Sequence, residues 1–190
     1  MNFSDYDFII QPGWQNSGPL HWQSQWQPQL LARRVQHQNP VLWDEPELNA
    51  WLDALHQQII ASDKPVVIIA HSLGCITLAH YAQRYGQPEV SRIHGALLVA
   101  PADVERAQAP LQLHSFRPIP QRALPFPSRI IASTDDPYCE HQRAEQFARW
   151  WGGALISLGS AGHINVDSGY TQWEAGLNQL QTLLNDIDNI

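Results

Sequence analysis

The chain has 190 residues, enough for one well-buried domain and few for two. Its 44% hydrophobic and 15% charged residues are typical of a globular protein and exclude a disordered chain. The formal net charge of −7, from 11 Lys and Arg against 18 Asp and Glu, argues against a nucleic-acid partner, because an acidic surface repels phosphate backbones.

The N-terminal residues, MNFSDYDFIIQPGW, carry acidic side chains and only a short apolar run, so they predict neither a signal peptide nor a membrane span. The two cysteines, Cys75 and Cys139, are too few for a disulfide framework. We therefore expect a reduced, cytoplasmic protein that does not insert into membranes.

The first third of the chain alternates short apolar runs with amphipathic stretches. Residues 7–11 (DFIIQ) predict a first strand, and residues 34–39 predict a polar second strand at an edge of the sheet. Residues 21–33 place apolar side chains four apart, as on one face of a helix. A second helix is expected to follow, with Asp44 as its N-cap. Its predicted apolar face consists of Leu48, Trp51, Leu52, Leu55 and Ile59.

The rest of the chain repeats the alternation of strand and helix. Four further apolar runs predict strands at residues 65–70, 95–100, 128–133 and 154–158. Amphipathic stretches predict helices at residues 73–85 and 140–151, and a last one through Trp173, Leu177, Leu180 and Leu184. Residues 103–127 are the exception, because they contain five prolines and little periodicity. They predict an irregular loop, either a functional flap or a poorly ordered segment.

Apolar strands separated by helices indicate an α/β fold with a mostly parallel, six-stranded sheet that is covered on both faces. We expect one such domain over residues 1–190, since residues 103–127 hold too little apolar sequence for a domain of their own. In an open sheet of this kind, ligands bind beyond the carboxyl ends of the strands. Polar side chains that directly follow strands are therefore the candidates for a site.

Ser72 directly follows the third predicted strand, in the run VVIIAHSLGC. The pattern small-x-Ser-x-Gly, with Ala70 before and Gly74 after Ser72, resembles the G-x-S-x-G nucleophile elbow of α/β-hydrolases. Small residues suit a sharp turn that brings the strand and helix backbones close together. The alternative is a plain strand-to-helix turn in which Ser72 N-caps the helix.

A serine hydroxyl needs a base to take its proton and an acid to hold that base. Asp135 and Asp136 follow the fifth predicted strand and His163 follows the sixth, so all reach the same edge as Ser72. The chain order Ser, Asp, His is that of α/β-hydrolases. Each residue also has a structural alternative, since an aspartate before Pro137 can make a turn and a loop histidine can be solvated. Asp136 is the predicted acid because it lies further into the loop, with Asp135 holding the turn.

Four motifs spread over nearly the whole chain occur together in one family. They are PGW…HW near the start, HSLG at the elbow, ASTDDPY after the fifth strand and GSAGHIN near the end. With these motifs the chain resembles small α/β-hydrolases of the retinoblastoma-binding-protein-9 and YdeN-like family, although it has Ala70 where the wider superfamily usually has glycine. The resemblance implies an α/β-hydrolase-type three-layer sandwich without a separate lid domain, and serine-hydrolase or esterase chemistry. It places the nucleophile on Ser72, the acid on Asp136 and the base on His163.

The expected reaction is cleavage of an ester-type bond, in a carboxylester or a thioester, through an acyl-enzyme on Ser72. The oxyanion needs two backbone N–H donors, which we expect from Leu73, directly after the serine, and from Trp14 in the loop after the first strand. Gln15 or Asn16 could replace Trp14 after a small shift of that loop. The sequence contains no motif for a metal or a nucleotide. We therefore predict no cofactor and a small-molecule ester, thioester or amide substrate.

Other functions share this machinery or this fold. The chain could be a non-catalytic protein-binding module, with a protein partner that the sequence does not identify, or an acyltransferase or peptidase with the same triad. His71 is expected to pack or bond locally, and Cys75 to lie in the core. Four more residues are candidates for the pocket wall, each with a structural alternative: Asn16, His21, Trp22 and Tyr138.

Overall fold

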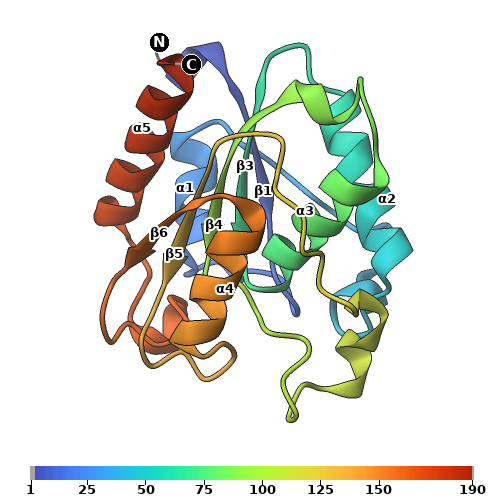
Figure 1. The fold of residues 1–190 in the computed structure, drawn as a ribbon. Helices are drawn as coiled ribbons and strands as arrows, with labels where there is room; N and C mark the ends of the chain where they lie inside the picture. The colour runs from blue at the N-terminus through green and yellow to red at the C-terminus, as the bar shows by residue number, and fades with distance from the viewer. Residues whose placement is uncertain (1–2, 190) are drawn as a thin grey trace.

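The computed structural model describes residues 3–189, and its centre is a sheet of six strands in the order β2-β1-β3-β4-β5-β6 (Figure 1). The strands are β1 (Asp7–Gln11), β2 (Arg33–Arg34), β3 (Val66–His71), β4 (Ile93–Val99), β5 (Ser128–Ala132) and β6 (Ala154–Ser157). All neighbours pair in parallel, which confirms the predicted α/β fold class. The chain runs outward from β1 to β2 and then returns to β3 on the other side of β1, so the strand order reverses between β1 and β3.

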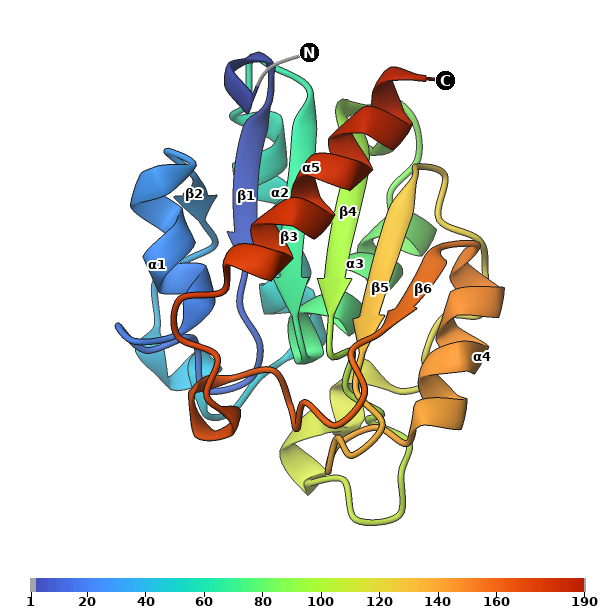
Figure 2. The ribbon, with the colours of Figure 1, turned by 90° about the vertical axis from the view of Figure 1, so that its left-hand side faces the viewer.

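Helices cover both faces of this sheet. They are α1 (Trp22–Gln29), α2 (Leu48–Ile60), α3 (Leu73–Arg84), α4 (His141–Trp151) and α5 (Glu174–Asp188). Because side chains alternate along a strand, Ile68 of β3 packs in the cluster that includes α2, α3 and α4, whereas Ile69 packs with α1 and α5. Figure 2 shows α1 and α5 together in front of the sheet. This burial on both faces explains why β3 is apolar along nearly its whole length.

The polar edge of the sheet differs from the prediction. The predicted strand at residues 34–39 is wrong beyond Arg34, because the chain turns there into a short 3-10 helix, Pro40–Trp43, capped by Asn39. The helix predicted for residues 21–33 ends at Gln29 instead. Leu31 takes a left-handed conformation with φ of 51°, which stops the helix and turns the chain into β2.

The N-cap predicted for the second helix is also wrong. Glu47, and not Asp44, caps α2, with its carboxylate accepting a hydrogen bond from the Ala50 amide at 2.8 Å. Pro46 explains the later start, because a proline disfavours helical backbone in the residue before it. Asp44 instead ends the preceding 3-10 helix.

Residues 103–127 form an irregular segment that is tied to the body of the protein. Its 3-10 helix, Leu111–Phe116, buries Leu113 and Phe116 in the cluster shared with α2 and α3. The Arg117 side chain donates a hydrogen bond to the Val104 carbonyl at 2.6 Å, which closes the segment on itself. Within residues 3–189, no helix combines the length and the apolar character needed to cross a membrane.

Candidate active site

Ser72 stands on a strained turn between β3 and α3. Its backbone has φ of 53° and ψ of −122°, a conformation that costs free energy for a residue with a side chain. Hydrogen bonds hold the turn, since the Ser72 amide donates to the Val99 carbonyl and the Cys75 amide donates to the Ser72 carbonyl, each at 3.0 Å. The hydroxyl makes no capping hydrogen bond to α3. Ser72 therefore occupies the N-cap position of α3, but its side chain does not cap the helix.

Two glycines allow other backbone to approach this turn. A Cβ on Gly74 would lie 2.5 Å from the Gln11 carbonyl oxygen and 2.7 Å from that of Pro12. A Cβ on Gly13 would lie 2.7 Å from the Cβ of Ser72. All three distances are shorter than a Cβ atom tolerates, so glycine at these positions lets the end of β1 pack directly against the serine turn.

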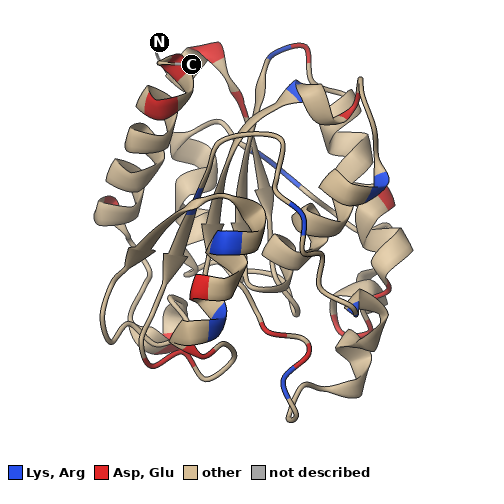
Figure 3. Ribbon diagram, in the orientation of Figure 1, with Lys and Arg blue, Asp and Glu red and all other residues tan. Residues whose placement is uncertain are grey.

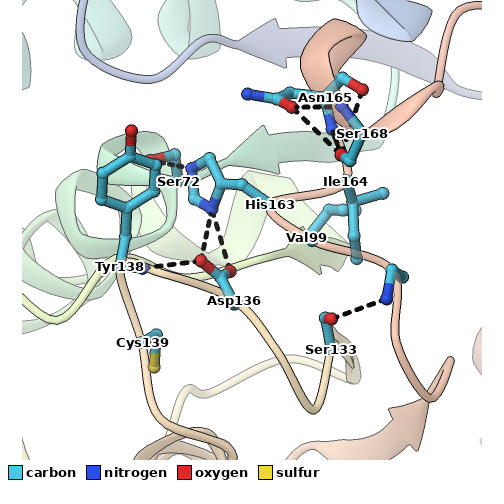
Figure 4. Close-up of polar contacts among 12 residues, drawn as sticks. Ser72, Val99, Ser133, Asp136, Tyr138, Cys139, His163, Ile164, Asn165 and Ser168 are labelled. Atoms are coloured by element: carbon cyan, nitrogen blue, oxygen red, sulfur yellow. Dashed lines mark hydrogen bonds and ion pairs between the residues drawn. The ribbon is translucent and has the colours of Figure 1, made fainter.

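The structure brings the three predicted polar side chains together (Figure 4). His163 Nε2 lies 2.9 Å from Ser72 Oγ, and His163 Nδ1 lies 3.0 and 2.9 Å from the two carboxylate oxygens of Asp136. The Asp136 side chain is 3% exposed and that of His163 is 8% exposed. The Tyr138 amide donates a further hydrogen bond to Asp136 Oδ1 at 2.8 Å. The Asp136 carboxylate is thus fixed by its own loop and faces the imidazole.

Asp135 has a different set of contacts from its neighbour. Its Oδ1 accepts hydrogen bonds from the Ser133 hydroxyl at 2.6 Å and from the amides of Ala161 and Gly162 at 2.9 and 2.8 Å. These hydrogen bonds lower the pKa of the Asp135 carboxyl below its usual value, and the bond from Ser133 has the largest effect, with that from Gly162 second. Asp135 therefore ties the turn after β5 to the loop that carries His163, in agreement with its expected structural role.

The loop that carries His163 also accepts hydrogen bonds from two aromatic side chains, a feature that the sequence did not reveal. His71 Nε2 lies 3.0 Å from the His163 carbonyl oxygen, and because a carbonyl only accepts, His71 must carry its proton on Nε2. Burial lowers the pKa of His71 well below its usual value, which favours the neutral form of the ring. Trp22 Nε1 donates to the next carbonyl, that of Ile164, at 2.9 Å.

The two predicted oxyanion donors are the backbone amides of Leu73 and Trp14. Among the hydrogen bonds of residues 3–189, neither the Leu73 nor the Trp14 amide serves as a donor. The two alternatives to Trp14 are engaged elsewhere, because the Gln15 amide donates to the Trp43 carbonyl at 2.9 Å and the Asn16 amide to the Gly13 carbonyl at 3.1 Å. Leu73 and Trp14 both border the same cavity as Ser72.

That cavity has a volume of about 340 Å³ and opens above the carboxyl ends of the strands. The expected pocket residues Asn16, His21 and Tyr138 line it, but Trp22 does not. Residues 103–127 supply part of the wall of this cavity. Cys75 is buried, and burial raises the pKa of its thiol, which agrees with its expected place in the core. No group of three or more potential metal ligands occurs among residues 3–189.

A parallel sheet whose strand order reverses next to a serine turn, with an aspartate and a histidine on later strand ends, is the architecture of an α/β-hydrolase. The chain belongs to the serine hydrolase family, whose sequence profile matches residues 8–182. Within that family it is a small α/β-hydrolase of the YdeN-like type, as the solved structures show.

The similar structures cover nearly the whole chain. A YdeN-like hydrolase from Pectobacterium atrosepticum is 29% identical, with a TM-score of 0.83 over 97% of this chain and 93% of that one. The ydeN gene product of Bacillus subtilis is 22% identical, with a TM-score of 0.72 over 95% and 99% of the two chains. A thermophilic esterase from Thermogutta terrifontis is 13% identical, with a TM-score of 0.66 over 96% and 90%. No curated protein sequence matches the chain.

Proposed function

We propose that this hydrolase cleaves carboxylesters or thioesters, with Ser72 as nucleophile, His163 as base and Asp136 as the acid that holds the base. The observation that carries the proposal is the unbroken line of contacts from Ser72 Oγ through both nitrogens of His163 to the Asp136 carboxylate. All of these contacts fall within hydrogen-bond distance. An Nδ1–H donated to Asp136 leaves the Nε2 lone pair facing the hydroxyl, which is the tautomer that a general base needs.

The reaction has two half-reactions. Ser72 Oγ forms a bond to the carbonyl carbon while its proton passes to His163 Nε2, and the carbonyl oxygen becomes an oxyanion. When the tetrahedral intermediate collapses, the bond to the alcohol or thiol breaks, and that leaving group takes the proton from His163. A water then gives its proton to His163 and its oxygen to the acyl carbon, which releases the carboxylic acid and restores the Ser72 hydroxyl.

The Leu73 and Trp14 amides are the proposed donors to the oxyanion. Leu73 is the first residue of α3, so the helix dipole also favours negative charge there. Hydrogen bonds of Gln15 and Asn16 hold the loop after β1 in place, and the Trp14 amide is left free at the cavity. A donor that is already oriented needs no reorganisation, and loss of one such donor typically costs about 10²–10³ in rate.

The first experiment tests whether Ser72 is a nucleophile. A fluorophosphonate probe is expected to label the wild-type protein and the Ser91→Ala variant, but not Ser72→Ala. Ser91 is the control because it is exposed and lies directly before β4, at the opposite end of the strands from Ser72. Hydrolysis of 4-nitrophenyl butyrate and of a butyryl thioester should fall by about 10⁴ or more in Ser72→Ala and in His163→Ala. Absence of labelling in the wild type, or equal labelling of Ser72→Ala, would favour a protein-binding module that keeps the fold without the chemistry.

A further inference from the structure

Arg106 is the one lysine or arginine among the described residues that line the cavity. Its guanidinium carbon lies 5.4 Å from the centre of the Tyr138 ring. The Tyr138 ring in turn packs edge-on against the His163 imidazole, with 4.6 Å between the ring centres. A single aromatic ring therefore separates the cation from the histidine of the site.

Apart from its contact with the Tyr138 ring, the guanidinium of Arg106 has no polar partner within residues 3–189. The segment after β4 carries acidic and basic residues in close succession (Figure 3), but its acidic side chains are engaged by α4. Asp103 pairs with Arg143 of α4 at 3.4 Å, and Glu105 pairs with the same guanidinium. Over residues 3–189, no ion pair and no side-chain hydrogen bond involves Arg106. Its five N–H donors are thus free to face a ligand in the cavity.

The backbone around Arg106 is held in one conformation. The Asp103 amide donates to the Tyr138 carbonyl at 3.0 Å, and the Glu105 amide donates to Asp103 Oδ1 at 3.0 Å. The Arg106 carbonyl accepts from the Ala109 amide at 3.0 Å. These contacts fix the backbone turn that carries Arg106 relative to the loop that carries Tyr138 and Asp136, and the guanidinium lies beside the Tyr138 ring at the wall of the cavity.

We propose that Arg106 binds a carboxylate on the substrate, so that the preferred substrates are esters or thioesters with an anionic group a few bonds from the scissile carbonyl. This inference rests on the proposed function of Ser72. A guanidinium binds a carboxylate through two parallel N–H···O bonds, which gives both affinity and orientation. The other ionised residues at the cavity are Asp103, which is paired, and Asp167, which is exposed. Since both are acidic, recognition of an anion here depends on the short-range fork of Arg106 and not on a general positive field.

Two pairs of synthetic esters test the proposal and locate the carboxylate. Mono-4-nitrophenyl adipate carries it on the acyl side and is compared with 4-nitrophenyl hexanoate. The hexanoate ester of 4-hydroxybenzoate carries it on the leaving-group side and is compared with phenyl hexanoate. We expect the wild type to prefer the charged member of at least one pair, measured as kcat/KM after correction for spontaneous hydrolysis.

The variants separate recognition from folding. Arg106→Gln should lower kcat/KM for the preferred charged ester by about 10- to 100-fold and leave its neutral partner within about threefold, because a hydrogen bond to a charged group contributes about 1.5–3 kcal/mol. Arg106→Lys should recover only part of the loss, since an ammonium lacks the planar fork. Arg122→Gln, an exposed arginine outside the cavity, is the matched control and should change neither ester. Equal losses on charged and neutral esters, or no loss on either, would overturn the proposal.

A direct binding measurement tests carboxylate binding by Arg106 separately from catalysis by Ser72. If no ester is hydrolysed, the catalytic proposal fails, while adipate binding can still be measured by titration calorimetry with the Ser72→Ala protein. Adipate binding that disappears in the Ser72→Ala, Arg106→Gln double variant supports a carboxylate site without catalysis. Absence of adipate binding together with the same kcat/KM for charged and neutral esters refutes the role of Arg106.

Discussion

Gly74 is the position at which a single methyl group should disturb both the stability of the fold and the site. It lies in the first turn of α3, where a Cβ would come within 2.5 Å of the Gln11 carbonyl oxygen and 2.7 Å of that of Pro12. These oxygens belong to backbone that is itself fixed, because Gln11 is paired with Ala70 of β3 and its carbonyl accepts a hydrogen bond from Gln23. They cannot move aside as the end of a flexible side chain would.

The structure sets the size of the effect. To bring the Gly74→Ala Cβ from 2.5 Å to 3.0 Å, the shortest separation that real Cβ atoms show, α3 and the end of β1 must separate by about 0.5 Å. Overpacking costs about 1–3 kcal/mol, and the better helix propensity of alanine offsets up to about 1 kcal/mol of it. We expect the free energy of unfolding to fall by about 1 kcal/mol. Because Ser72 begins the same turn, its acylation should slow by about tenfold or more.

Urea unfolding followed by tryptophan fluorescence measures the first effect, and the rate of fluorophosphonate labelling without urea measures the second. Gly86→Ala is the matched control, because a Cβ there meets no atom within 4 Å. It should leave the labelling rate unchanged and the stability equal or slightly higher. A Gly74→Ala protein with the wild-type urea midpoint and labelling rate would refute the view that close backbone approach builds the serine turn.

Three further predictions concern buried and paired side chains. Asp136→Asn should lower kcat by about 10⁴, whereas Asp135→Asn should chiefly lower Tm. Because the pKa of Asp135 is lowered in the folded state, its carboxylate stabilises the fold above the unfolded pKa of about 4, and this stabilisation is lost at lower pH. The Tm values of the wild type and of Asp135→Asn, measured against pH, should therefore converge in acid. Burial lowers the pKa of His37 to about 4, so on acidification the imidazole is protonated in the unfolded chain before it is protonated in the folded one. The free energy of unfolding should therefore fall as the pH drops from about 6.5 toward 4. Urea midpoints should show that His37→Phe flattens this fall and exposed His94→Phe does not. Arg34 donates four hydrogen bonds to α1 and the loop before it, so Arg34→Lys should lower the free energy of unfolding by about 1–3 kcal/mol in the same assay.

The central strands and the three polar residues could be predicted because they follow from local pattern and topology. A strand buried on both faces must be apolar without a break, and residues 66–70 of β3 have this pattern. Ser72, Asp136 and His163 each lie in the segment that follows a strand, so parallel pairing alone brings them to one edge. No side-chain detail was needed for that step.

The contacts that support these residues could not be predicted, because they join distant parts of the chain through side chains with no pattern. His71 is 92 residues from the carbonyl it binds on His163, and Trp22 is 142 residues from its partner Ile164. Which carbonyl each ring meets depends on how the loop after β6 crosses the edge of the sheet. The hydrogen bonds of Arg34 could not be predicted for the same reason. In the sequence, Arg34 is only one charged residue of a polar edge strand.

Backbone strain gathers at the same edge as the polar residues. Of the six described non-glycine residues with positive φ, five lie in segments that follow strands: Gln15, Asn16, Ser72, Ala100 and Ile164. The first three of these line the cavity. Such conformations cost about 1–3 kcal/mol each and persist only where the surrounding structure holds them. Among these residue types only asparagine commonly adopts a left-handed conformation, so the sequence indicates the strain at Asn16 alone. The buried sheet must supply the stability that keeps the other four in place, and this links the apolar strands to the geometry of Ser72.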